Sequence, residues 1–292
     1  MSERILEDIS KWPIEKRRAK LEQIYEQRIG IPLNLDNPKR MTEKTQWRKL
    51  YENDPRITRC INKLTFKQYV RERLGDGYTA QIIDVWHSPD DVNILGGIPD
   101  HCVLKSNCSS DGKNVILIHN KADIDTSGTE EIIKTTWFDR LLLHTNSFMS
   151  AYYPVKPCVI VEDLIAEIAS GVDEYKFFCF DGEPACVYHS NNHFCRGKNT
   201  NCSVSFFDLS WNNLGIQYGN HFNNPSARKP IFMNDMIRIS RILSKDFSFV
   251  RVDFFETDEK FFLAEMAFTQ GAGLTPYQPD WFDFRLGTLW RF

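Results

Sequence analysis

The sequence contains no long apolar run. A helix that crosses a bilayer needs roughly 18 or more apolar residues in succession, and no segment of the 292-residue chain provides them. The opening residues, MSERILEDISKW, are charged and lack the apolar core of a secretory signal. We therefore expect a cytoplasmic protein without a membrane span.

The chain also lacks a strong charge of either sign. It has 36 Lys and Arg residues against 39 Asp and Glu residues, which gives a formal net charge of −3 at pH 7. Proteins that bind nucleic acid through general electrostatic attraction carry an excess of basic residues. We expect no nucleic-acid partner, and any anionic ligand must be held by a local cluster of cations.

Cysteine pairs of the CxxC type are absent. The eight cysteines are scattered along the chain, and in a reducing compartment such cysteines are free thiols that are mostly buried. One short cluster, His189, His193 and Cys195 in HSNNHFC, contains residue types that bind zinc. A zinc site needs three or four ligands at set spacing, and no second cluster completes this one. A polar loop is the favoured interpretation.

The periodicity of apolar residues changes near residue 100, and the chain has no internal repeat. The first hundred residues are mainly helical by pattern, with helices at 13–30, 42–54 and 62–75 and Thr42 as the expected cap of the second. After them, strands are predicted at 101–107, 114–120 and 158–165, hairpins at 174–190 and 250–268, helices at 129–145 and 233–247, and an irregular insert at 190–228. This alternation predicts an α+β or α/β fold.

The second hairpin, VRVDFFETDEKFFLAEMAF, has carboxylates inside both of its apolar runs. Asp253 and Glu265 lie twelve positions apart, and pairing about the turn ETDEK can bring them to one face. Arg251 shares the face of Asp253, because side chains alternate along a strand. Two carboxylates with room for water and phosphate suit Mg²⁺. A buried ion pair between Arg251 and one carboxylate is an equally favoured interpretation of the hairpin alone.

Three upstream segments add polar groups at strand ends. In VLKSNCSSDGKNVILI, Lys105 ends a strand and a small-residue loop containing Gly112 follows, which can place backbone N–H groups against phosphates. CVIVEDLI ends in Glu162 and Asp163, and EYK places Glu174 and Lys176 on one strand face. Each lysine alone is an ordinary surface residue, so only the order of the elements is informative.

That order resembles the ATP-grasp superfamily. Within it, the chain is most similar to the TupA-like ATP-grasp proteins of bacterial surface-polysaccharide gene clusters, over about residues 35–292. The resemblance is carried, in chain order, by Lys63 in NKLTFKQYV, Lys105 in VLKSNCSSDGK, VIVEDLI, EYKFFCFDGEP and RVDFF…FLAEMAF. RVDFF followed by AE also resembles the metal hairpin of D-alanine–D-alanine ligases. The resemblance implies an α+β ATP-grasp fold with nucleotide between two α+β domains. It implies a mainly helical N-terminal domain at 1–100, a small mobile lid at 101–165 and an ATP- and metal-binding catalytic domain at 166–292.

The resemblance also implies a role for each matching position. Lys63 and Lys105 match the lysines that bind the α- and β-phosphates, and Ser106 to Gly112, which includes Ser109, matches the flap over the phosphates. Glu162, Asp163, Leu164 and Ile165 match the hinge that binds adenine. Glu174 matches the acidic residue that binds the ribose. The catalytic positions are Arg251, which matches the arginine that steadies the intermediate, and Lys176, near phosphates or substrate. Asp253 and Glu265 match the Mg²⁺ ligands. Many family members carry Asn two residues after the glutamate, where this chain has Ala267.

The implied activity is ATP- and Mg²⁺-dependent formation of an amide through an acyl phosphate. The implied partners are a small-molecule or glycan carboxylate of the hexuronic-acid class, an amino acid or amino alcohol, and membrane-bound polysaccharide machinery. The substrate candidates are His189, His193, Arg196 and Lys198, with Gly271 and Gly273 in the loop that frames the acceptor. Two alternatives stay open, namely a phosphotransferase on the same scaffold and a nucleotide-binding module without catalysis. The intact Arg251, Asp253 and Glu265 argue against the second.

Overall fold

The structure of the chain is a computed structural model that describes residues 7–109, 114–140, 148–165, 173–191 and 203–291. Its strands are β1 (Ile82–Trp86), β2 (Cys102–Ser106), β3 (Val115–Ile118), β4 (Val159–Asp163), β5 (Glu174–Phe180), β6 (Glu183–Ser190), β7 (Val204–Phe207), β8 (Gln217–Tyr218), β9 (Phe249–Glu256), β10 (Phe261–Ala267) and β11 (Tyr277–Gln278). They form antiparallel sheets in the orders β1-β4-β2-β3, β10-β9-β5-β6-β7 and β11-β8.

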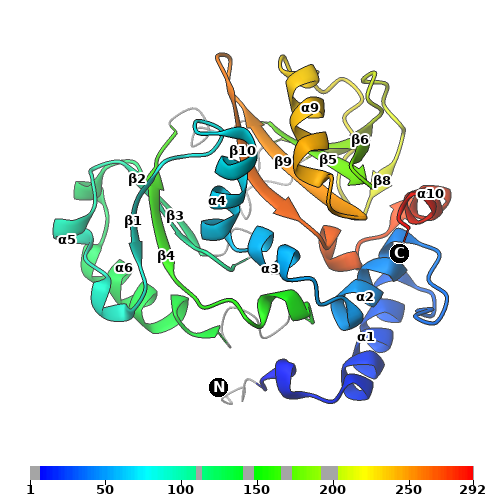
Figure 1. Cartoon of the computed structure of the whole chain (residues 1–292), viewed down its shortest axis with the longest axis horizontal. Helices are drawn as coiled ribbons and strands as arrows, with labels where there is room; N and C mark the ends of the chain where they lie inside the picture. The colour runs from blue at the N-terminus through cyan, green and yellow to red at the C-terminus, as the bar shows by residue number, and fades with distance from the viewer. Residues whose placement is uncertain (1–6, 110–113, 141–147, 166–172, 192–202, 292) are drawn as a thin grey trace.

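The helices of the described residues lie around and between these sheets. They are α1 (Ile14–Ile29), α2 (Met41–Tyr51), α3 (Pro55–Ile61), α4 (Lys63–Leu74), α5 (Ile94–Gly97), α6 (Thr126–Ile132), α9 (Met233–Ser244) and α10 (Trp281–Leu289). Short 3-10 helices lie at Ile9–Lys11, Pro89–Asp91, Lys121–Asp123, Ser150–Tyr152 and Gln270–Gly273, the last labelled η7. Figure 1 shows the four-stranded sheet at the left, the five-stranded sheet at the right, and α3 and α4 between them. The predicted α+β class is confirmed. No helix of the described ranges is both long and apolar enough to cross a membrane.

The predicted N-terminal helices are present, with one error at a cap. α1 ends at Gly30 and α4 at Gly75, as the sequence predicted, and the Asn62 side chain caps α4 by accepting from the Leu64 N–H at 3.0 Å. Thr42 is not the cap of α2, because the helix already begins at Met41. Thr42 is buried, and its N–H and hydroxyl both donate to Asp283 of α10, at 2.9 and 2.6 Å. The start of α2 is therefore capped both by distant Asp283 and by Glu43 within the helix, which accepts from the Arg40 N–H at 2.9 Å.

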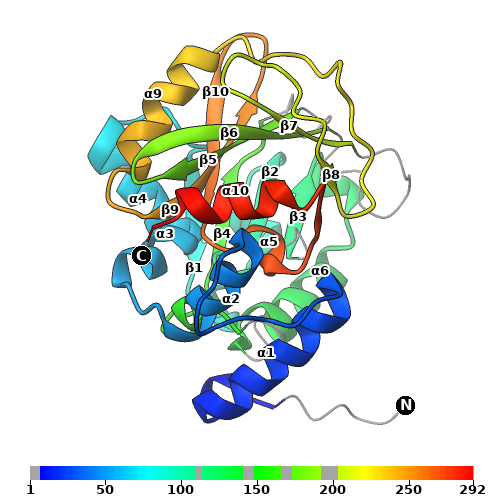
Figure 2. The ribbon, with the colours of Figure 1, turned by 90° about the vertical axis from the view of Figure 1, so that its right-hand side faces the viewer.

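The five-stranded sheet has a core on each face. On one face, Tyr175, Phe177, Val252 and Phe254 pack against α3, α4 and α9. On the other face, Phe178 and Phe249 belong to a second aromatic cluster that includes residues of α2 and α10. Figure 2 shows α10 lying across this second face. The part of that face beyond the aromatic cluster carries the charged residues described below.

The four-stranded sheet has its own core. Leu104, Val159 and Val161 pack against Trp86 and Ile133, and α6 continues as a π-helix at Ile133–Trp137. β1 belongs to this sheet although it begins before residue 101, the first residue of the predicted lid. The sheet therefore reaches into the range assigned to the N-terminal domain, and the division into three domains stays a prediction.

The irregular insert predicted at 190–228 is wrong at 204–207 and 217–218, where the chain forms β7 and β8, whereas residues 208–216 and 219–228 form no helix or named strand, as predicted. β7 is buried and forms an edge of the five-stranded sheet, and β8 pairs with β11. The ring of Trp211 stacks on Phe207 with centroids 4.2 Å apart. Asn-rich composition suggested a loop, but buried aromatic side chains from this segment complete the core. Residues 192–202 lie outside the described residues.

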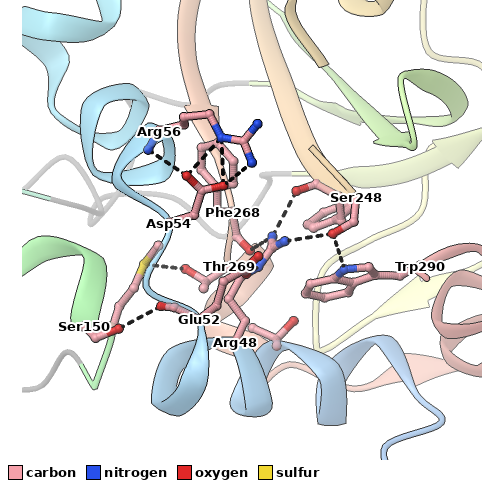
Figure 3. Close-up of polar contacts among 12 residues, drawn as sticks. Arg48, Glu52, Asp54, Arg56, Ser150, Ser248, Phe268, Thr269 and Trp290 are labelled. Atoms are coloured by element: carbon pink, nitrogen blue, oxygen red, sulfur yellow. Dashed lines mark hydrogen bonds and ion pairs between the residues drawn. The ribbon is translucent and has the colours of Figure 1, made fainter. Parts of the chain in front are cut away.

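Helix α2 fixes the base of the β9–β10 hairpin through one buried arginine (Figure 3). Arg48 donates from Nη1 to the carbonyl of Phe249 at 2.9 Å and to that of Phe268 at 3.1 Å. Its guanidinium lies 4.2 Å from the ring centroid of Trp290 and forms an ion pair with Glu52. One side chain thus ties together the first residue of β9, the residue after β10 and the C-terminal segment, which holds the hairpin in a fixed position.

Candidate active site

Charged side chains gather on one face of the five-stranded sheet, opposite the face that packs on α9. Asp253 of β9 lies between Lys176 of β5 and Glu265 of β10 in the register of the sheet. Arg251 and Glu174 lie two residues before Asp253 and Lys176 on their strands, so they share the face. Five ionisable groups therefore meet on three neighbouring strands.

A β-bulge brings Glu265 to this face. Leu263 pairs with Phe254, and the register then shifts so that Glu265 lies opposite Asp253. Without the extra residue, Ala264 would lie opposite Asp253, and Glu265 would point to the other face of the sheet, because side chains alternate along a strand. The shared face expected for the two carboxylates is thus produced by an irregularity in the hairpin.

Arg251 is the cation that both carboxylates contact. Its Nε donates to Asp253 Oδ1 at 2.7 Å, and its Nη2 lies 2.5 Å from Asp253 Oδ2 and 3.1 Å from Glu265 Oε1. Nη1 donates to the side-chain oxygen of Gln270. Burial raises the pKa of Asp253 to about 6 in spite of the attraction of Arg251 and Lys176. Partial burial opposes the charge of Glu265, but Arg251 outweighs it and lowers the pKa of that carboxyl.

Lys176 and Glu174 form a second buried ion pair beside the first. Lys176 Nζ lies 2.6 Å from Glu174 Oε2, which also accepts from the Ser190 hydroxyl at 3.1 Å. The ammonium lies 5.1 Å from the ring centroid of Tyr188. Buried ion pairs are costly to form unless every lone pair and proton is satisfied, so this degree of burial points to a role other than stability alone.

A third group of charges lies on the four-stranded sheet and α4. Lys105 Nζ is 2.5 Å from one oxygen of the buried Glu162, and Lys67 Nζ is 3.2 Å from the other. Burial would raise the pKa of Glu162, but Lys105 and Lys67 lower it below its ordinary value. Lys63, one helical turn before Lys67, donates to the carbonyl of Ser109 at 2.5 Å. The two strand-end positions Lys105 and Glu162 are therefore in direct contact.

The groups on the two sheets belong to one charged cluster. Lys63 lies close enough to Glu265 to lower the pKa of that carboxyl, and Glu162 and Lys105 in turn act on Lys63. Burial lowers the pKa of the Lys63 ammonium. We use "charged cluster" for Lys63, Lys67, Lys105, Glu162, Glu174, Lys176, Arg251, Asp253 and Glu265. Its five cations exceed its four carboxylates, so the cluster suits a polyanion that brings a metal ion with it.

The carboxylates fit a magnesium ion that is shared with phosphate. Mg²⁺ is usually held by one or two carboxylates and completes its shell with water and substrate phosphates. Asp253 and Glu265 supply two such oxygen donors on one face. Within the described ranges, no group of three or more His, Cys, Asp or Glu side chains is arranged to hold a metal by itself. The donor set therefore fits a site that is completed by a nucleotide.

A cavity of about 710 Å³ opens beside Asp163 and Ile165, two of the residues predicted to form an adenine hinge. Its wall also includes Lys67 of α4, Gln81 and Phe262 of β10. The backbone around the hinge is held in place, because the Asp163 N–H donates to the Gln81 carbonyl at 3.0 Å. The wall combines apolar side chains such as Ile82 and Phe262 with charged ones such as Lys67 and Lys260, and a space of this size suits the ring system of a small polar ligand.

The loop at Gln270–Gly273 supports Arg251 from the side opposite Asp253. Gln270 accepts from Arg251 and donates to the Tyr218 hydroxyl at 3.0 Å. The next three residues all have positive φ, at 51°, 54° and 63°, and a Cβ at Gly271 would collide with Tyr218. Gln46 of α2 donates to the carbonyl of Gly273 at 2.7 Å. α2 thus fixes the turn that aims Gln270 at Arg251.

Two residues of the site, Gln270 and Lys67, were not predicted from the sequence. Gln270 carries no distinctive pattern, because a glutamine before a glycine-rich turn is common in loops. Lys67 has a recognisable signal, since it lies four residues after Lys63 on a helix and therefore shares its side.

Several predicted substrate residues are not brought to the charged cluster. His189 pairs with Tyr175 in the sheet and therefore lies on the other face, where it packs near Trp211 and within 3.1 Å of Asp173. Gly112, His193, Arg196 and Lys198 lie outside the described residues. The described cysteines at 60, 102, 108, 158, 179 and 186 are free and buried, as predicted.

Comparison with known proteins identifies a family and several similar solved structures. A family model described as TupA-like ATP-grasp matches residues 43–291. No curated protein matches the chain. Among solved structures, the chain is similar to the D-alanine–D-alanine ligase from Bacillus anthracis complexed with ATP, at 14% identity and a TM-score of 0.41 over 71% of this chain and 54% of that one.

Two further structures have comparable similarity. One is the carboxyaminoimidazole ribonucleotide synthase from Aspergillus clavatus complexed with ATP, at 11% identity and a TM-score of 0.40 over 72% of this chain and 44% of that one. The other is the ATP-grasp ligase PsnB complexed with minimal precursor, at 11% identity and a TM-score of 0.39 over 79% of this chain and 61% of that one. The chain therefore spans about half the length of the solved proteins it matches.

Proposed function

The chain belongs to the TupA-like ATP-grasp family, and from this premise we propose that it is an ATP-dependent ligase that joins a carboxylate to an amine. The observation that carries the proposal is the charged cluster. Lys63, which lies far in sequence from the β9–β10 hairpin, is within electrostatic reach of both Glu265 and Lys105, and Arg251 contacts both carboxylates of the hairpin. An ion pair that only stabilises the hairpin would not require a lysine from a distant helix beside it.

The cations bind and orient the triphosphate of ATP. Lys63 and Lys105 project from α4 and β2 toward the same space and offset the charge of the phosphates. The cavity beside Asp163 and Ile165 receives the adenine, and its wall includes Lys67, which pairs with the predicted hinge residue Glu162. Glu174 accepts from the ribose. Lys63 also binds the Ser109 carbonyl, so phosphate binding and the position of the flap are coupled.

Asp253 and Glu265 would hold Mg²⁺. When bound, the ion neutralises negative charge on the phosphates as the phosphoryl group is transferred. Arg251 donates to both carboxylates, which fixes their oxygens and favours their ionised forms against the effect of burial. Ala267 offers no metal-binding group, so Asp253 and Glu265 would be the side chains that hold the ion.

The reaction proceeds in two steps that conserve atoms and charge. An oxygen of the substrate carboxylate attacks the γ-phosphorus, the bond from that phosphorus to the bridging oxygen breaks, and ADP leaves with that oxygen. The amine lone pair then attacks the acyl carbon, and phosphate leaves with the former carboxylate oxygen while the amine loses a proton. Lys176 reduces the repulsion between the carboxylate and the phosphates, and Arg251 stabilises the oxyanion of the second step.

The proposed substrates are a hexuronic acid, free, nucleotide-linked or within a glycan, and an amino acid or amino alcohol. Membership in a family associated with surface polysaccharides supports this choice of carboxylate. The turn that contains Gly271 and Gly273 supports the place of the acceptor, because it lies directly beside Arg251 through Gln270. His193, Arg196 and Lys198 remain candidates for contact with the sugar.

We place a mobile lid at 101–165 between a helical domain at 1–100 and a catalytic domain at 166–292. Both larger sheets contribute to the charged cluster, so a nucleotide between them should hold them together. Hydrogen exchange with and without a nonhydrolysable ATP analogue tests this proposal. Slower exchange at 101–165 on binding supports a closing lid, and equal exchange contradicts it.

A matrix of uronic acids against amines, read by ADP release and by product mass, tests the activity. We expect ADP release that needs ATP, Mg²⁺, one carboxylate and one amine, with a product mass equal to the two substrates less one water. ADP release without an amine, together with a phosphorylated product, would replace the ligase by a phosphotransferase. The Glu265→Gln variant serves as the inactive control.

A further inference from the structure

Helix α10 is apolar on both of its sides. Phe282 and Leu286 are buried in the aromatic core, whereas Trp281, Phe284 and Leu289 are 48%, 38% and 38% exposed. The spacing of the exposed three places them on one outer side of the helix. Figure 2 shows that α10 lies at the surface turned to the viewer, with no element in front of it. A surface helix normally presents polar residues to water, so this side has the composition of a contact surface.

Basic residues surround this apolar strip. Arg285 lies on the outer side of α10, and Arg291 follows the helix, and both are exposed. Lys39 is exposed and adjacent, because its backbone packs directly on Gly287 of α10. We call Lys39, Trp281, Phe284, Arg285, Leu289 and Arg291 the α10 patch.

The nearest carboxylates do not cancel this positive charge. The guanidinium of Arg40 lies 4.1 Å from the ring centroid of Phe284 and pairs with Asp280 at 3.1 Å. Asp283 is buried and accepts from Thr42. The exposed charge around the strip is therefore basic although the whole chain has a net charge of −3.

This charge decides between possible occupants. A symmetric contact with a second copy would place the same patch on both sides and bring Arg285, Arg291 and Lys39 against their equivalents, which is repulsive. A stable protein interface needs about 800 Å² from each partner, and a single short helix offers a narrow ridge. A bilayer surface needs only a few inserted aromatic or aliphatic side chains next to basic residues.

We propose that the α10 patch binds the surface of a bilayer that contains anionic lipids. Trp281, Phe284 and Leu289 enter the headgroup region, while Arg285, Arg291 and Lys39 contact the lipid phosphates. The helix lies in the plane of the membrane and does not cross it. The charged cluster is on other strands and helices, so binding is separate from the proposed ligase reaction.

Flotation of the full chain with lipid vesicles tests the proposal. We expect the protein to float with vesicles of phosphatidylcholine mixed with phosphatidylglycerol, not with phosphatidylcholine alone, and to be released as the salt concentration rises. Trp281→Ser together with Phe284→Ser should lower the partition coefficient by roughly tenfold or more. Arg285→Glu should also lower it by roughly tenfold. Leu95→Ser, at an exposed apolar residue of α5, is the matched control and should bind as the unchanged protein does.

Three results would overturn the proposal. The first is equal flotation with neutral and anionic vesicles, or none with either. The second is an equal loss of vesicle binding in Leu95→Ser, which would indicate non-specific adsorption of exposed apolar residues. The third is a dimer of the unchanged chain in solution that Trp281→Ser and Phe284→Ser dissociate, which would assign the patch to a second copy. Melting temperatures show that each variant is folded, and Arg285→Glu, at an exposed position, tests the patch without removing apolar side chains.

Discussion

Replacing Glu265 with glutamine separates metal binding from structural support. The change keeps the shape of the side chain and removes its charge. Glu265 Oε1 lies 3.1 Å from Arg251 Nη2, but the side chain is 43% exposed, and ion pairs open to solvent stabilise a fold by about 1 kcal/mol or less. Arg251 keeps its two contacts with Asp253. The melting temperature should therefore fall by about 4 °C at most.

The expected loss of activity is much larger than the loss of stability. A metal ion supplies several kcal/mol of charge stabilisation in phosphoryl transfer, and a deficit of that size lowers a rate by about a hundredfold or more. Magnesium titration of ADP release and a thermal melt are measured on one preparation. Asp258→Asn is the matched control, because it removes an exposed carboxylate from the turn of the same hairpin.

Asp253→Asn would not separate the two roles. Asp253 is buried and makes both of its contacts with Arg251, and removal of one partner from a buried pair costs about 3–5 kcal/mol. This variant should lose stability and activity together. The reasoning on Glu265 is refuted if Glu265→Gln melts many degrees lower and yet, once folded, releases ADP at the original rate and with the original magnesium dependence.

Three further predictions follow from the contacts around the charged cluster and the adjoining loop. Lys63→Ala and Lys105→Ala should each raise the Kd for ATP by roughly tenfold or more, since each removes a charge-assisted contact with phosphate. Calorimetry measures both dissociation constants, and two unchanged values would contradict the proposed nucleotide site. Gln270→Leu should lower kcat by about tenfold while the Kd for ATP stays the same, because Arg251 loses the group that orients it. Equal losses in kcat and in affinity for ATP would contradict an orienting role. Burial lowers the pKa of Lys49 to about 7, so above that pH the unfolded chain binds more protons than the folded one, and the free energy of unfolding should rise with pH. Urea unfolding at pH 7 and pH 9 should show this rise, and its persistence in Lys49→Met would refute it.

The sequence alone predicted the features that depend on neighbours along the chain. The ends of α1 and α4 at Gly30 and Gly75 were predicted because helix termination is local. The hairpin at 174–190 was also predicted, and its turn residues Asp181 and Gly182 both adopt the positive φ that Asp and Gly tolerate. The order along the chain of the strand-end lysines and carboxylates is a property of the sequence itself, so the resemblance to the family could be detected without the structure.

The tertiary structure decided which of these residues meet. A bulge at one residue of β10 turns Glu265 toward Asp253, and the spacing of the two residues does not reveal it. His189 has the chemistry of a substrate residue, yet the register of β6 places it on the opposite face from Lys176. Gln270 reaches Arg251 only because α2, more than 200 residues earlier, fixes the turn that follows it. Contacts between distant segments depend on the register of strands and the packing of helices, and these are set by the whole core rather than by any short stretch of sequence.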